Sequence, residues 1–182
     1  MSRQYWSSPV GPMHAAAGAS YNTSVTITDV SPGGLTNPIE MPGSALDLGS
    51  VIRINAWGTY AVSATTPTII LGFYYGGVAG TALAVTAATA VTNSATVNWP
   101  WRMYWEGMVT ATGTSGAILG NGWWDLATSL TATTHLPRPA TAPASVTIDT
   151  TVQKAVTTGA TWGASAAANI LFCNFMSVEL LG

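Results

Sequence analysis

Charged side chains are scarce in this sequence of 182 residues. Asp, Glu, Lys and Arg make up 7% of the chain, against roughly 25% in an average soluble domain. The five cations are widely spread: Arg3, Arg53, Arg102, Arg138 and Lys154. Nucleic-acid binding needs clustered cations that displace counterions from phosphates, so we expect no nucleic-acid partner. The surface must be neutral and polar, and such a surface tends to associate unless partners cover it.

Metal ligands and reactive groups are equally few. The chain has one cysteine, Cys173, and two histidines, His14 and His135, which are both distant from Cys173 in the sequence. One thiol cannot form an internal disulfide, and two histidines without a Cys or carboxylate cluster do not make a zinc centre. Cys173 lies in an apolar stretch, which favours a small buried side chain over a catalytic thiol. We therefore expect no metal site and no cofactor.

The seven carboxylates are scattered, and no pair stands out as an acid–base couple. Glu106 and Asp125 could face each other across a hairpin, but a salt bridge with Arg102 is the simpler interpretation. The segment GTSG at 113–116 is one residue short of a nucleophile elbow and is flanked by strands, so we interpret it as a turn. We expect no enzymatic activity.

Long apolar runs are also absent. No segment approaches the roughly 20 apolar residues of a membrane-spanning helix, and residues 1–19 lack the apolar core of a signal peptide. We therefore expect neither a membrane partner nor a signal peptide.

What the chain does contain is the pattern of β-strands. Segments rich in Val, Ile, Thr and aromatics alternate in polarity and are bounded by Gly, Pro or Asn. Eight or nine strands follow, with long connections over 31–50 and 130–144: 24–30, 51–62, 68–75, 82–89, 99–112, 117–128, 145–150, 152–162 and 169–181. Such spacing predicts an all-β fold, an antiparallel β-sandwich of the jelly-roll type. It occupies residues 23–182 and follows an extended N-terminal arm over 1–22.

Alternation also predicts which side chains face the core. In the strand over 51–62 these are Ile52, Ile54, Ala56, Tyr60 and Val62, and in the strand over 99–112 they are Trp101, Met103, Trp105, Val109 and Ala111. In the returning strand, Ile118, Trp124 and Leu126 share one side with Gly120 and Gly122.

The last strand is apolar on both faces. Leu171, Cys173, Phe175 and Leu181 lie opposite Ile170, Phe172, Met176, Val178 and Leu180. A strand that is apolar on both faces is buried on both, and the outer face of a sandwich is buried by a subunit or another element. This pattern predicts a homo-oligomer.

The eight tryptophans allow two interpretations. Core and interface packing is the first, because Trp supplies large buried area and anchors interfaces. A platform that stacks on sugar rings is the second. Alternation leaves Trp57 and Trp123 outside the core. With the aromatics of the arm and the outward side chains of the last strand, they form the predicted contacts with a subunit or another partner: Tyr5, Trp6, Tyr21, Trp57, Trp123, Leu171 and Phe175.

Three blocks carry a resemblance to a known family. They are LGSVIRINAWGTY at 48–60 with TPTIILGFYYGG at 66–77, WPWRMYWEG at 99–107 continuing to the turn at 113–116, and VTIDTT at 146–151 with TWGASAAAN at 161–169. In order and spacing they resemble small jelly-roll structural proteins of tailed bacteriophages, over roughly residues 46–181. No catalytic motif belongs to this resemblance.

The resemblance implies a part of the virion, exposed on the outer surface of the phage particle. A capsid decoration or minor capsid protein is the expected role, with the major capsid protein as partner and the arm clamping neighbouring capsid subunits. A symmetric cluster such as a trimer is the form of the homo-oligomer that this role implies. The alternative is a tail-fibre or tail-tip protein that recognises a host-surface glycan. An enzyme such as a depolymerase is a further rival, and it would require a carboxylate pair in a groove.

Overall fold

The structure is a computed structural model, and it describes residues 7–9, 21, 25–32, 38–62, 67–91, 98–129, 132–138 and 144–182. The chain folds as two antiparallel sheets, and no helix occurs in these ranges. Accordingly, the described residues include no helix long and apolar enough to cross a membrane. The prediction of an all-β, sandwich-like fold is confirmed at this level.

The larger sheet has seven strands. They are β1 (Ser7–Pro9), β4 (Val51–Ala61), β8 (Trp99–Ala111), β9 (Gly116–Ser129), β10 (Ala132–Arg138), β11 (Val146–Ile148) and β13 (Ile170–Leu181). The order across the sheet is β1-β13-β4-β8-β9-β10, and β11 also pairs with β9. The predicted turn at 113–116 joins β8 to β9, where Gly113 supplies the positive φ of 109°.

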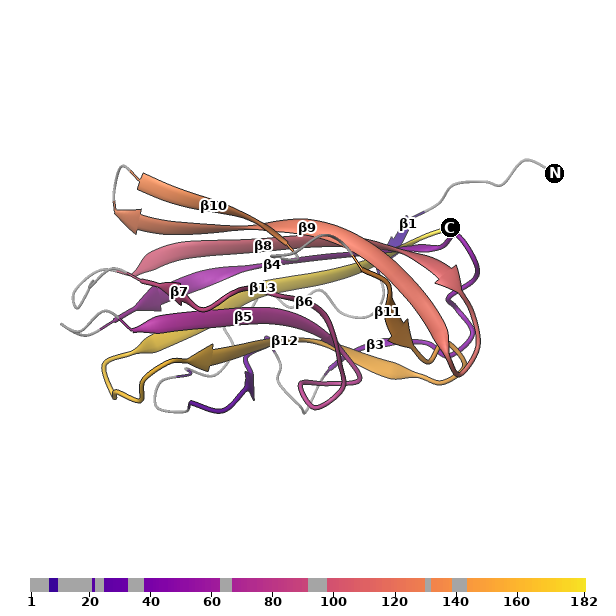
Figure 1. The fold of residues 1–182 in the computed structure, drawn as a ribbon, viewed down its shortest axis with the longest axis horizontal. Coiled ribbons are helices and arrows are strands. Elements are labelled where there is room, and N and C mark those ends of the chain that lie inside the picture. Colours follow the sequence, from indigo (N-terminus) through magenta and orange to yellow (C-terminus); the bar gives the residue numbers. More distant parts are fainter. Residues whose placement is uncertain are drawn as a thin grey trace.

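The smaller sheet has six strands. They are β2 (Thr28–Asp29), β3 (Ile39–Met41), β5 (Thr68–Tyr75), β6 (Thr81–Val85), β7 (Thr89–Ala90) and β12 (Lys154–Trp162). The path β2-β12-β5-β6 carries β3 on β12 and β7 on β5. In Figure 1 this sheet, marked by β5 and β12, lies below the layer formed by β4, β8, β9 and β10.

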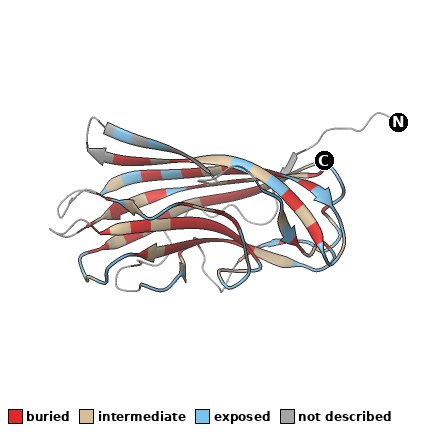
Figure 2. Cartoon of the chain, in the orientation of Figure 1, coloured by how far each residue is buried: buried red, intermediate tan, exposed pale blue. Residues whose placement is uncertain are grey.

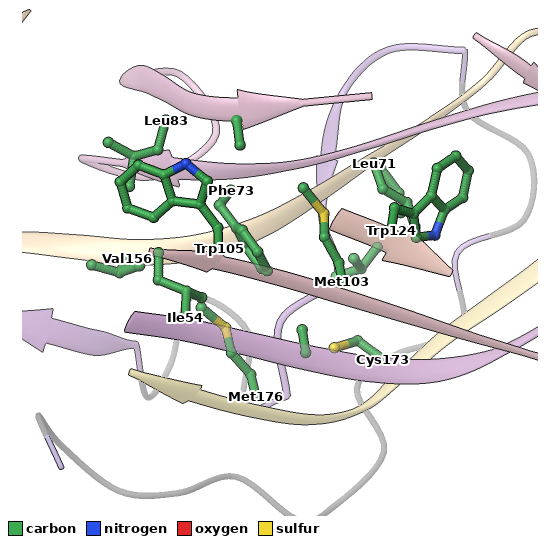
Figure 3. Close-up of a cluster of buried hydrophobic side chains, with 14 of the residues drawn as sticks. Ile54, Leu71, Phe73, Leu83, Met103, Trp105, Trp124, Val156, Cys173 and Met176 are labelled. Carbon is green, nitrogen blue, oxygen red and sulfur yellow. The ribbon is translucent and has the colours of Figure 1, made fainter. Parts of the chain in front are cut away.

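A single hydrophobic core lies between the sheets. Figure 3 shows Trp105, Trp124 and Met103 of the larger sheet among Leu71, Phe73 and Leu83 of the smaller one. The banding of buried and exposed residues along β8 and β9 follows the two-residue period of a strand (Figure 2). Burial of these apolar faces, at about 25 cal/mol per Å² removed from water, is the main source of stability.

The predicted core faces of the two central strands are confirmed with one exception. All five predicted side chains of β4 and its flank are at most 1% exposed, and Trp101, Met103, Trp105 and Val109 of β8 are also buried. The prediction for Ala111 is wrong, because Ala111 is exposed. The pairing of β8 with β9 shifts register between Val109 and Ala111, and this irregularity turns the end of β8 away from the core.

The predicted assignment of the β13 side chains to its two faces needs correction. Its pairing with β4 shifts register between Cys173 and Phe175. A β-bulge of this kind reverses the alternation, so Leu171 and Cys173 before it face the core together with Met176 and Val178 after it. The bulge therefore changes which apolar residues face the core, while Ile170, Phe172, Phe175 and Leu181 remain half-buried on the outer side. The strand is still apolar on both faces, and the predicted homo-oligomer stays a prediction.

Cys173 is fully buried at this bulge, as its apolar setting predicts. Burial raises the pKa of its thiol to about 12, so the thiol stays protonated at neutral pH. This favours a packing role for Cys173 over a reactive one.

A strand buried on both faces does exist, in the smaller sheet. Residues 71–75 of β5 are all buried, and Tyr74 lies over Gly72 and Gly159 on the outer side. A Cβ at Gly159 would come within 2.8 Å of the Tyr74 ring and 3.1 Å of Ile27 and Val78. Segments of the same chain therefore cover this part of the smaller sheet.

Two predicted connections contain strands. The segment 31–50 includes β3, and the Pro-rich segment 130–144 includes β10. Pro137 is tolerated in β10 because this strand is the last in the order, and an edge strand does not need every backbone N–H.

The predicted arm over 1–22 is described only at residues 7–9 and 21. Both parts lie against β13: Ser7 pairs with Leu181, and Tyr21 forms a bridge to Leu171. Tyr5 and Trp6 lie outside the described residues.

Candidate functional site

Aromatic and charged side chains gather on the outer face of the seven-stranded sheet. Strand alternation and register bring them together from five strands, and they are half-buried or exposed. The outer face is defined here as Val51, Arg53, Asn55 and Trp57 of β4, Arg102, Tyr104, Glu106 and Met108 of β8, Leu119, Asn121, Trp123 and Asp125 of β9, His135 of β10, and Phe175 and Glu179 of β13.

An ion-pair network lies near the middle of this face. The Arg53 Nε lies 2.6 Å from an oxygen of Glu106, and its Nη1 lies 3.2 Å from an oxygen of Glu179. The Tyr104 hydroxyl donates a further hydrogen bond to Glu106. This bond and the Arg53 guanidinium lower the pKa of the Glu106 carboxyl against the opposing effect of partial burial. The network joins β13, β4 and β8, and it keeps Glu106 ionised.

This arrangement predicts a pH-dependent contribution to stability. A carboxyl whose folded pKa is lowered stabilises the protein above its unfolded pKa, 4.5 here, and loses that contribution as the pH falls through the folded value. Glu106→Gln should therefore lower the free energy of unfolding at pH 7, by less than about 1 kcal/mol because the pair is partly exposed. The difference from wild type should shrink as the pH falls below 4.5 and vanish once Glu106 is protonated in the folded protein, as measured by urea unfolding over a series of pH values from 7 downward. A difference that stays constant over this pH series would show that lost packing, not charge, causes it.

A stack of aromatic rings stands beside the network. Tyr104 and Trp123 lie with ring centroids 4.1 Å apart and an interplanar angle of 24°. His135 approaches the other side of Trp123, at 6.4 Å between centroids, and its Nδ1 contacts the Asp125 carboxylate. The stack divides the outer face into two ends.

The apolar end lies toward the 113–116 turn. Val51, Met108 and Leu119 come together there because Met108 pairs with Val51 on one side and with Leu119 on the other. Met108 is 47% exposed and Leu119 is 40% exposed. With Tyr104, Glu106, Asn121 and Trp123 they line a hollow of about 500 Å³. Its lining is mainly apolar, and large exposed apolar patches mark interaction sites.

The aromatic end lies on the other side of the stack. Trp57 is 44% exposed, and its indole packs on Phe175 with centroids 6.0 Å apart and an interplanar angle of 17°. Trp57 also lines a second hollow of about 220 Å³, with Gly58, Pro100, Arg102, Asp125 and Thr133 among the lining residues. Arg102 donates to the Asn55 side chain over 3.2 Å.

The structure brings together three of the seven predicted contact residues. Trp57, Trp123 and Phe175 share the outer face, as their predicted outward direction requires. Tyr21 and Leu171 are instead buried, at 5% and 0% exposure, and Tyr21 stacks on Trp162 in the core. The predicted outward direction of Leu171 is wrong because of the bulge in β13.

The predicted salt bridges with Arg102 are replaced by other pairs. Glu106 binds Arg53, and Asp125 contacts His135. Glu106 is opposite Asn121 and Asp125 is opposite Arg102, so the two carboxylates are separated by four residues along the hairpin and do not face each other. Alternation places Arg53 and Glu106 outward, but their pairing depends on the register between β4 and β8.

No group of three or more His, Cys, Asp or Glu suited to a metal ion occurs among the described side chains. The candidate site combines aromatic, apolar and paired charged groups on one face of the larger sheet. No protein-family model matches the chain, and no curated protein is significantly similar to it.

Proposed function

We propose that this chain is a structural protein of a tailed-phage particle, a jelly-roll sandwich that decorates the assembled head. The observation that carries the proposal is the apolar end of the outer face, where Met108 and Leu119 are large, exposed and adjacent. The chain has few charges to keep such a surface in water, so contact with a partner is the natural use of it.

Decoration acts through mass action. A protein that binds only the assembled lattice stabilises that lattice by its binding free energy. A symmetric cluster such as a trimer would place several apolar ends against neighbouring capsid subunits. The N-terminal segment would extend the contact, since β1 is only a three-residue strand at a sheet edge and holds few hydrogen bonds.

Binding to purified empty heads tests the proposal. We expect saturable binding and, for particles carrying a label at Gly182, a regular lattice of label over the head in electron micrographs. The double variant Met108→Ser, Leu119→Ser should bind heads at least about tenfold more weakly, because two large side chains lose their apolar burial. Val25→Ser is the matched control, since Val25 is 54% exposed and precedes β2 of the other sheet.

Two results would contradict the proposal. The first is the absence of affinity for heads. The second is label confined to the end of the tail, which would assign the chain to host recognition.

A further inference from the structure

We propose that the hollow beside Trp57 binds a sugar ring of an uncharged glycan, with Trp57 as the stacking surface and Asp125 and Arg102 as hydrogen-bonding groups. This binding activity goes beyond head decoration and uses the opposite end of the outer face. A chain with both properties would bind the head through the apolar end of the outer face and a glycan through the aromatic end.

The orientation of Trp57 is the first argument. Phe175 lies on β13 at one side of β4, and it packs nearly parallel to the indole. The hollow lies at the other side, over β8 and β9, and Trp57 contributes to its wall. The indole is therefore held in place from one side while 44% of its surface stays exposed. A preorganised aromatic surface binds the apolar C–H face of a sugar ring at low entropic cost.

The polar groups beside the hollow are the second argument. The exposed wall of the hollow is almost wholly apolar, and Arg102 and Asp125, directly opposite each other on β8 and β9, contribute to it mainly with the apolar parts of their side chains. We place their charged ends beside the hollow. Arg102 donates to Asn55, and Asp125 contacts His135. A guanidinium has five donors and a carboxylate about four acceptor sites, so each keeps capacity for a ligand. Sugar hydroxyl groups both donate and accept hydrogen bonds, and they match this mixed pair.

Charge and size decide the class of ligand. The wall of the hollow is almost wholly apolar, and the side chains that contribute to it include one cation and one anion, so it offers no net charge to a phosphate or to a polycation. A volume of about 220 Å³ suits a single small ring. A protein partner would instead need about 800 Å² of complementary surface on each side. An uncharged glycan residue fits these limits.

A glycan array followed by calorimetry tests the inference with the whole chain. The array should carry uncharged hexose and N-acetylhexosamine oligosaccharides, and its strongest ligand should be titrated into each variant. We expect Trp57→Ala to weaken binding by at least about tenfold, while Trp57→Phe retains most of it because an aromatic face remains. Asp125→Asn should weaken binding less, since an amide still accepts one hydrogen bond.

The controls separate binding from folding. Thr110→Ala removes an exposed side chain of β8 outside the hollow and should bind like wild type. Trp57→Ala should unfold at nearly the wild-type temperature, because Trp57 is outside the core.

Three results would overturn the inference. They are no binding to any array glycan, full binding by Trp57→Ala, and a loss of head binding but not of glycan binding on mutating Trp57. The last result would assign the hollow to a protein partner. Head binding by wild type, measured in parallel, shows whether the proposed decoration role stands independently.

Discussion

Replacing Gly58 by alanine is expected to lower the free energy of unfolding by about 3 kcal/mol. Gly58 lies in β4, where Cys173 of β13 pairs with it next to the bulge. A Cβ built at Gly58 would come 1.9 Å from the Phe172 carbonyl oxygen and 2.8 Å from its carbonyl carbon. These are backbone atoms, so no side-chain rotation relieves the clash. Either the two strands separate or the bulge moves.

Urea unfolding of Gly58→Ala measures the loss directly, and Gly182→Ala is the matched control. No atom lies within 4 Å of a Cβ at Gly182, so the control should equal wild type. A second readout is the reaction of Cys173 with a thiol reagent. The buried thiol should be inert in wild type and react faster in Gly58→Ala if β13 loosens. If Gly58→Ala were as stable as wild type, the close approach of β4 and β13 would not be required for the stability of the protein.

The bulge matters for the proposed glycan site because it positions Phe175. Without the shift in register, the alternation of β13 would not place Phe175 beside Trp57 on the outer face. Gly58 therefore links the stability of the larger sheet to the support of the proposed stacking surface. A Gly58→Ala variant that folds is expected to lose glycan affinity through this support, with Trp57 itself unchanged.

Strand alternation was sufficient to predict the all-β fold because it depends only on residues that are neighbours in the sequence. The faces of β4 and β8, including Trp57 outside and Trp105 inside, follow from neighbours within one segment. The bulge in β13 could not be predicted in this way. No glycine or proline marks it in residues 170–181, and the residue that permits it, Gly58, lies in a different strand far earlier in the chain.

In the candidate site, too, the direction of each side chain follows from its own strand, whereas its partner depends on how distant strands pair. The outward direction of Arg53, Arg102 and Glu106 follows from alternation, but the choice of Arg53 as the partner of Glu106 does not. That choice depends on β4 and β8 pairing with Arg53 opposite Glu106. A shift of two residues would keep every side chain on its face and give Glu106 a different partner.

Trp105→Ala is expected to be the most damaging single substitution in the core, with a loss of about 4 kcal/mol in the free energy of unfolding. Trp105 is 1% exposed and lies against Gly107 and Gly120, as a Cβ at either glycine would fall 2.1 to 2.2 Å from its ring. Glycines have no side chain that can move into the space left by the indole. The cavity would therefore persist, and a persistent cavity adds to the loss of apolar burial.

A double-mutant cycle with Gly107→Ala gives this prediction a sharper form. The three nearest atoms to a Cβ at Gly107 all belong to the Trp105 ring, at 2.1, 2.6 and 2.8 Å. Gly107→Ala alone should therefore destabilise the protein, whereas in the Trp105→Ala background the added methyl enters the cavity and should be neutral or stabilising. A positive coupling of about 1 kcal/mol or more between the two sites, measured by urea unfolding, is the expected result. Additive losses would contradict the prediction. They would mean that Gly107→Ala destabilises the protein through the backbone of β8, and not through a clash with the Trp105 indole.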